Sequence, residues 1–161
     1  MSRARAALGS LVFLVVGPGV VAGLVPWFLT RWRMHDAPLA LRVVGGVLIA
    51  AGAAVVLHGF SRFVVEGLGT PSPAAPARRL VVGGAYRYVR NPIYLAVTTV
   101  IAGEALLLGR LGLLAYAAGC LLLFAAFVRL YEEPTLRRQF GEDYERYRRE
   151  VPGWLPRWPA S

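Results

Sequence analysis

Two short stretches of the sequence concentrate residue types that can bind a polar ligand. The first, Tyr86–Tyr94, brings together aromatic rings, arginines and the amide of Asn91. The second, Arg129–Glu133, ends in two adjacent carboxylates, Glu132 and Glu133. A carboxylate can accept two hydrogen bonds from a diol or hold an ammonium group. The second stretch could therefore bind a cationic or polyhydroxyl ligand.

The two carboxylates also have a purely structural interpretation. Adjacent carboxylates at the end of an apolar helix repel each other and resist burial, so nearby arginines could simply neutralise them. Arg129, Arg137 and Arg138 are the obvious partners. Because neighbouring residues on a helix point about 100° apart, we expect Glu132 to face a ligand. We expect Glu133 to make the structural contact, through Arg137 one turn further on.

Other kinds of site find little support in the sequence. The two histidines, His35 and His58, are far apart, and Cys120 is the single cysteine, so no metal-ligand cluster is expected. No nucleophile-elbow pattern occurs, and Gly83-Gly84 alone is too short for a phosphate-binding loop. The net charge of +9 comes from arginines that flank apolar runs. This arrangement suits lipid head groups better than nucleic acid.

The elements that must position the two stretches are apolar helices. Hydrophobic residues make up 57% of the 161 residues, and a membrane span needs about 20 predominantly apolar residues. Four candidate spans are Ala7–Leu29, Leu39–Phe60, Ile93–Gly109 and Leu111–Leu130. Only Arg110 joins the last two, which predicts a tight helical hairpin. Both ligand-binding stretches then return to the same membrane boundary and lie close together, although about 40 residues separate them.

The remaining segments predict a single, all-α, polytopic membrane domain over residues 1–161 with an amphipathic tail helix. In the tail, apolar residues recur at helical spacing, at Leu136, Phe140, Tyr144, Tyr147 and Val151. Such a helix lies on a membrane surface or against a partner helix. The predicted parts are an N-terminal helix pair (7–60), a cytoplasmic loop (61–92), the hairpin (93–130) and a cytoplasmic tail (131–161) that binds the ligand together with residues 78–94.

Three segments carry a resemblance to a known superfamily. Gly84–Tyr94, Tyr131–Leu136 and Phe140–Tyr147 resemble the isoprenylcysteine carboxyl methyltransferase and phospholipid methyltransferase superfamily, and Val151–Pro156 fits its tail. The resemblance covers about residues 69–156. Its two main motifs occur in order on either side of a helical hairpin, which makes it specific. The first two predicted spans carry no signature.

The resemblance implies S-adenosylmethionine as the methyl donor, bound at the cytoplasmic boundary. The implied cofactor-binding residues are Leu80, Val81, Tyr86, Asn91, Pro92, Ile93, Tyr94 and Glu132, with Glu133 beside them. The superfamily usually has histidine where this chain has Asn91. Asparagine cannot take a proton near neutral pH, so the resemblance implies an orienting role there and not a general base. Arg129 is the nearest counterpart of an arginine that contacts the substrate in the prenylcysteine enzymes.

The expected reaction is methyl transfer to a lipidic or hydrophobic acceptor, through a carboxylate or an amine. This in-line displacement mainly needs the two reactants held close and aligned with water excluded, so a site without an obvious base is suitable. Two alternatives stay open from the sequence: an NADPH-dependent membrane reductase of the sterol-reductase type, and a non-catalytic accessory protein of the membrane.

The arginine distribution predicts the orientation in the membrane. Fourteen of the eighteen arginines lie at the N-terminus, in the middle loop and in the tail, and four flank the other two loops. The positive-inside rule then places both termini in the cytoplasm, as in a multi-pass protein of a bacterial inner membrane. Reporter fusions at either terminus should give the cytoplasmic signal. An external signal from the C-terminal fusion would refute this orientation.

Overall fold

The structure, a computed structural model, describes residues 3–67, 70 and 77–158. Every regular element in these residues is a helix. The helices over Ala7–Thr30, Leu39–Glu66 and Gly112–Phe140 are long and apolar enough to cross a membrane, and Pro92–Leu108 is a shorter apolar helix of 17 residues. The predicted all-α membrane fold is confirmed, and the third predicted span is present as the shorter apolar helix.

The helices follow one another with few breaks. The first rod consists of α1 (Arg3–Leu14), a π-helical segment (Val15–Leu24) and α2 (Val25–Thr30). The second is α3 (Leu39–Arg62) with a π-helical turn to Gly67. A 3-10 turn (Gly84–Arg87) then leads into α4 (Pro92–Leu108). The last rod joins α5 (Gly112–Phe127), a π-helical turn (Val128–Glu132) and α6 (Glu133–Phe140), and α7 (Glu142–Glu150) follows.

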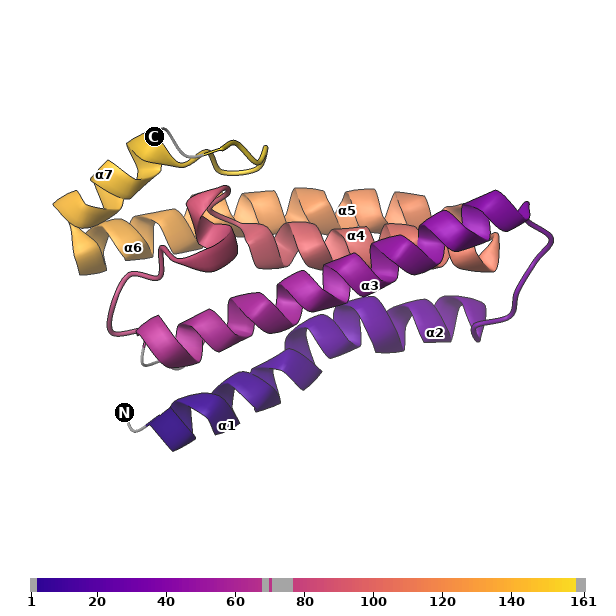
Figure 1. The fold of residues 1–161 in the computed structure, drawn as a ribbon, viewed down its shortest axis with the longest axis horizontal. Coiled ribbons are helices and arrows are strands. Elements are labelled where there is room, and N and C mark those ends of the chain that lie inside the picture. The colour runs from indigo at the N-terminus through magenta and orange to yellow at the C-terminus, as the bar shows by residue number, and fades with distance from the viewer. Residues whose placement is uncertain (1–2, 68–69, 71–76, 159–161) are drawn as a thin grey trace.

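The arrangement places the start of the chain and its last helix at one end of the bundle. In Figure 1, α4 and α5 form an antiparallel hairpin, α3 crosses α4, and the rod of α1 and α2 lies along α3. The start of α1 and the whole of α7 lie at the same end, and the α2–α3 connection lies at the opposite end. The predicted hairpin is therefore present, and its two outer ends meet near α7.

The π-helical segment in the first rod follows from its prolines. The amide of Val25 donates to Val20 O, five residues back. In the same pattern the next donor would be the nitrogen of Pro26, which carries no hydrogen, so Val21 O loses its intrahelical partner. The hydroxyl of Tyr116 in α5 donates to Val21 O at 2.8 Å. Lipid offers no hydrogen-bond donor to Val21 O, so this bond gives that carbonyl its partner and connects the first rod to α5.

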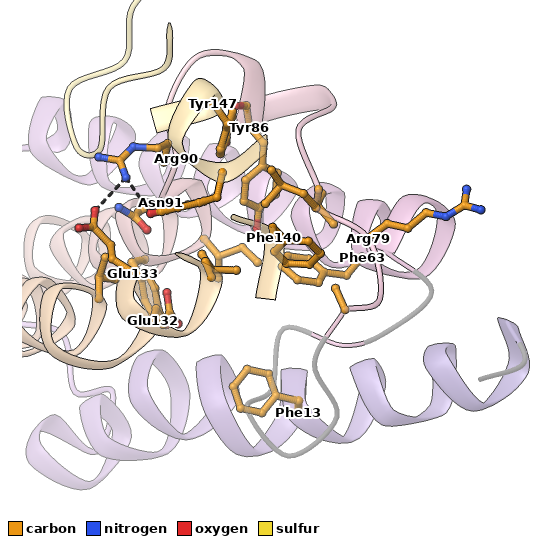
Figure 2. A pocket seen from close by; sticks show the side chains of 18 residues that line it. Phe13, Phe63, Arg79, Tyr86, Arg90, Asn91, Glu132, Glu133, Phe140 and Tyr147 are labelled. Atoms are coloured by element: carbon orange, nitrogen blue, oxygen red, sulfur yellow. Dashed lines mark hydrogen bonds and ion pairs between the residues drawn. The ribbon is translucent and has the colours of Figure 1, made fainter. Parts of the chain in front are cut away.

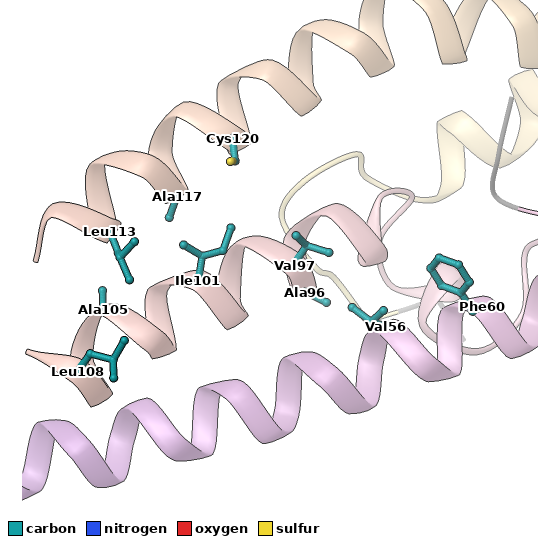
Figure 3. Close-up of a cluster of buried hydrophobic side chains, with 10 residues drawn as sticks. All are labelled: Val56, Phe60, Ala96, Val97, Ile101, Ala105, Leu108, Leu113, Ala117 and Cys120. Atoms are coloured by element: carbon teal, nitrogen blue, oxygen red, sulfur yellow. The ribbon is translucent and has the colours of Figure 1, made fainter. Parts of the chain in front are cut away.

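Small residues bring α3 and α4 into close contact. Gly45, Gly52 and Gly59 recur every seven residues along α3. A Cβ atom on Gly45 would lie 2.6 Å from Gly103 O in α4, and one on Gly52 would lie 2.8 Å from Ala96 O. Close backbone approach of this kind is how membrane helices gain van der Waals contact. The buried side chains of α3, α4 and α5 belong to one cluster, in which Leu113, Ala117 and Cys120 of α5 lie on the side of α4 away from α3 (Figure 3).

The second helix is longer than the sequence predicted. We expected it to end at Phe60 and the loop to begin at residue 61, but α3 and its π-helical turn continue to Gly67. Arg62 and Glu66 form an ion pair one turn apart along this extension. Such a pair supports a helix that has left the apolar region. The Pro-rich residues 71–76 of the predicted loop lie outside the described part of the chain.

The tail contains two helices where the sequence pattern predicted one. Gly141 has φ +53° and ψ −124°, a conformation that side-chain-bearing residues rarely adopt, and it separates α6 from α7. The apolar residues of α6 and α7 nevertheless pack into one cluster. Tyr144, Tyr147 and Val151 are buried with Val81 and Tyr86, and Leu136 and Phe140 pack against them. The stripe therefore covers the segment before α4.

The α3–α4 contact provides a matched pair of substitutions. Gly45→Ala should lower the stability by about 1–3 kcal/mol, because the new methyl group overlaps backbone atoms of α4. Gly46→Ala is the control, since a Cβ there meets nothing within 4 Å, and it should be neutral or slightly stabilising. The measurement is thermal unfolding in detergent. A Gly45→Ala variant as stable as Gly46→Ala would contradict this close packing.

Candidate functional site

A pocket lies where the outer ends of the hairpin meet α7. Its cavity volume is about 120 Å³, and it opens to solvent. Eight of the nine residues predicted to bind a cofactor line it: Leu80, Val81, Tyr86, Asn91, Ile93, Tyr94, Glu132 and Glu133. Pro92 does not line the pocket and forms the first turn of α4. Arg129 is exposed and lies outside the pocket lining.

Several lining residues were not among the predicted ones. Phe13 reaches the pocket from α1, and Phe63 reaches it from the turn after α3. Phe140, Tyr144 and Tyr147 belong to the apolar stripe of the tail, which the sequence did reveal as a face but not as part of a site. No sequence signal pointed to the two phenylalanines of the N-terminal helix pair. Arg79 and Arg90 also line the pocket.

The two ligand-binding stretches make a direct contact in the pocket. The hydroxyl of Tyr94, in the first turns of α4, donates to the carboxylate of Glu132 at the end of the π-helical turn. The Tyr94 ring also packs against Phe124, with ring centroids 4.8 Å apart. The prediction that these stretches are neighbours is confirmed. Glu132 makes no ion pair with any described residue, so no cation among these residues neutralises its carboxylate.

Glu133 points to a different partner from the one expected. Its carboxylate pairs with Arg90 at 2.8 Å and lies 4.0 Å from Arg148. Arg137, the partner predicted from helical spacing, pairs with Glu145 of α7 at 2.7 Å instead. The predicted Glu133–Arg137 pair is therefore wrong. The turn at Gly141 brings α7 close to Arg137, so Glu145 of α7 becomes its partner.

Arg90 holds three segments together at one side of the pocket (Figure 2). Its Nη1 atom donates to Glu133 and, at 3.0 Å, to the hydroxyl of Tyr144. Its Nε atom donates to Val151 O at 3.0 Å. Two of its three nitrogens are therefore bonded to α6, α7 and the chain after α7. Such a cation can be partly buried because a carboxylate and two further acceptors bind its donors.

Asn91 continues this contact with the chain after α7. Its Nδ2 atom donates to Gly153 O at 3.0 Å, and the backbone amide of Arg90 donates to Pro152 O at 2.9 Å. Together with the Arg90–Val151 bond, three consecutive carbonyls are bound by two residues. Asn91 is only 8% exposed. Its Nδ2 atom thus positions the chain segment after α7, and its Oδ1 atom can still accept a hydrogen bond from a ligand.

Burial keeps the hydroxyls of three pocket tyrosines protonated. Tyr147 donates to Tyr86 O at 2.7 Å. Burial raises the pKa of Tyr86 well above its ordinary value and also raises the pKa of Tyr147. Burial, followed by the nearby Glu133 carboxylate, raises the pKa of Tyr144 against the opposing effect of Arg90. All three hydroxyls therefore stay protonated at neutral pH, and none of them is a general base.

The fold is that of a multi-pass membrane protein with a pocket at one end of its helices. The family model described as phospholipid methyltransferase matches residues 40–143, a region that contains the hairpin and both ligand-binding stretches. The chain belongs to this family and is a membrane methyltransferase. No curated protein and no solved structure matches the sequence. The family match favours the methyltransferase over the reductase and the accessory protein considered from the sequence.

The role of Arg90 gives a test of stability. Arg90→Ala should destabilise the protein by about 3–5 kcal/mol, because it leaves the carboxylate of Glu133 partly buried without its main partner. The Arg90 and Glu133 side chains are 13% and 16% exposed. Arg146→Ala is the control, since its side chain is 65% exposed and 3.9 Å from Asp143, and should cost about 0–1 kcal/mol. Equal unfolding temperatures of the two variants would refute the role of Arg90.

Proposed function

We propose that this protein is an S-adenosylmethionine-dependent methyltransferase that methylates a carboxylate or an amine of a lipidic or hydrophobic acceptor. Family membership supports the methyl transfer. The carboxylate of Glu132, unpaired by any cation among the described residues and set in a largely aromatic pocket, is the observation that supports this cofactor. S-adenosylmethionine carries an ammonium group and a sulfonium centre, which a carboxylate and aromatic faces can stabilise.

The residues of the pocket suit the requirements of this chemistry. When bound, the cofactor supplies a methyl group on a positively charged sulfur. Glu132 would hold a positive group of the cofactor, with Tyr94 fixing the carboxylate by its hydrogen bond. Asn91 Oδ1 would accept a bond from the ligand. Tyr86 and Ile93 would form the walls that exclude water and hold the reactants in line. A carboxylate acceptor needs no base, and an amine acceptor needs only to be neutral.

The acceptor would reach the pocket from the bilayer. A second, apolar groove of about 410 Å³ runs between the first rod, α3 and α4, with Leu14, Pro18, Val56 and Val97 among its lining residues. Phe13, which precedes Leu14 in α1, lines the pocket. Its ring stacks on the ring of Phe60, with the ring centroids 6.1 Å apart. The groove would hold the hydrocarbon part of the acceptor beside the pocket, with Phe13 between the two.

The cofactor would enter from the aqueous side. The pocket lies at the end of the bundle that holds the start of α1 and α7 (Figure 1). In the orientation predicted from the arginines, this end faces the cytoplasm of a bacterial cell. Both termini would be cytoplasmic, and the water-soluble cofactor and the membrane-soluble acceptor would approach by separate routes.

Glu132 and Glu133 distinguish cofactor binding from simple charge balance. Glu132→Gln should weaken S-adenosylmethionine binding by about 1.5–3 kcal/mol through loss of a charge-assisted contact, with little change in stability. Glu133→Gln should lower the unfolding temperature more, because Arg90 loses its ion pair. Calorimetric titration and thermal unfolding of both variants provide the measurements.

The control for this pair is the exposed Glu142, whose Gln variant should change neither quantity. Normal cofactor affinity in both Glu132→Gln and Glu133→Gln would show that the pair is not the cofactor site. A parallel titration of the wild-type protein with NADPH tests the reductase alternative. Binding of NADPH with no binding of S-adenosylmethionine would overturn the proposed function.

A further inference from the structure

The charged residues of the pocket leave one cation without a partner. Four charged side chains line it: Arg79, Arg90, Glu132 and Glu133. Arg90 is bound to Glu133, and Glu132 accepts its bond from Tyr94. Arg79 makes no ion pair or hydrogen bond with the part of the chain that the structure describes, and it is exposed to solvent. The pocket therefore has a positive charge available for a ligand in addition to the negative charge of Glu132.

The backbone around Arg79 is held in place on both sides. The side chain of Gln139 in α6 donates to Ala77 O at 2.7 Å. Two residues after Arg79, Val81 is 5% exposed and packs in the cluster with Tyr86 and Tyr144. Arg79 is thus carried on a short segment anchored to α6 and to the core of the tail. Its position at the pocket is fixed by the fold, although its guanidinium is exposed.

The two unpaired charges lie on opposite sides of the pocket. Figure 2 shows the Arg79 side chain leading outward on the side away from Glu132 and Glu133, next to Phe63. Aromatic residues, including Phe63 and Phe140, line the pocket together with these charges. The lining therefore offers an acidic region, an apolar and aromatic wall, and a solvent-exposed basic group on the other side. A ligand that is cationic at one point and anionic at another matches this distribution.

We propose that Arg79 binds an anionic oxygen group of a ligand held in the pocket. Under the proposed function, on which this inference rests, two ligands carry such a group: the cofactor through its carboxylate, and a phospholipid acceptor through its phosphate. Both groups present the pair of oxygens that the planar guanidinium binds with two parallel hydrogen bonds. Arg79 is then a binding residue of the site and sets its preference for anionic ligands.

The test compares Arg79→Gln with Arg78→Gln in the purified full-length protein. Arg78 is the neighbouring exposed arginine and does not line the pocket. The probes are S-adenosylmethionine, its decarboxylated form, which keeps the sulfonium and lacks the carboxylate, and dihexanoyl phosphatidate, a soluble lipid phosphate. Calorimetry in neutral detergent gives the Kd of each probe for each variant.

Two results would support the proposal and identify the source of the anionic group. If Arg79 holds the cofactor carboxylate, Arg79→Gln weakens S-adenosylmethionine binding about tenfold and leaves the decarboxylated form unchanged. If it holds a lipid phosphate, the variant weakens phosphatidate binding about tenfold and leaves S-adenosylmethionine unchanged. Arg78→Gln changes each Kd less than twofold in both cases. Arg79→Lys keeps the charge and retains part of the affinity.

Four results would overturn the proposal. The first is an Arg79→Gln variant that binds every probe as the wild-type protein does. The second is a wild-type protein that binds none of the probes. The third is an equal effect of Arg78→Gln, which would reflect general attraction of anions to a basic surface. The fourth is equal weakening of both forms of the cofactor. A wild-type protein that binds phosphatidate but not S-adenosylmethionine would reject the proposed function and still measure the role of Arg79.

Discussion

The ion pair between Arg90 and Glu133 connects parts of the chain that are far apart in sequence. Arg90 precedes α4, Glu133 begins α6, and the same guanidinium reaches Tyr144 in α7 and Val151 after it. Removing the partner of a partly buried cation is strongly destabilising, so these contacts hold the four segments in place together. The pocket depends on this constraint, because its walls come from the same segments. Glu132 remains available for a ligand since its neighbour Glu133 satisfies the arginine.

Within the apolar helices a different constraint applies. Lipid offers no hydrogen bonds, so each backbone carbonyl must find a partner in the protein. At Pro26 the chain meets this requirement with the hydroxyl of Tyr116, which joins the first rod to α5. Between α3 and α4, glycines permit contact between backbones. The N-terminal helix pair is therefore attached to the hairpin by packing and by single polar contacts, and through Phe13 and Phe63 it also contributes to the pocket.

The sequence predicted the parts of the fold that depend on composition over many residues. The length of the apolar runs predicted the four apolar helices. Because the chain must cross back through the run that follows Arg110, the same lengths predicted the hairpin and the proximity of Tyr94 to Glu132. The partner of Glu133 and the helix break at Gly141 did not follow. A single glycine between two helical patterns leaves the apolar periodicity intact, so only the backbone reveals that the chain turns there. Phe13 and Phe63 were missed because an aromatic residue facing a ligand and one facing lipid look alike in sequence.

The bonds to three successive carbonyls after α7 have a consequence for the order in which the protein matures. Arg90 and Asn91 are synthesised some sixty residues before Val151, Pro152 and Gly153, their hydrogen-bonding partners. Every apolar helix precedes these partners in the chain, so the pocket can be completed only after the last residues of the tail have been synthesised. Assembly of the pocket is therefore a late event. A chain truncated before Val151 would keep all the apolar helices and would lack the contacts that complete the pocket.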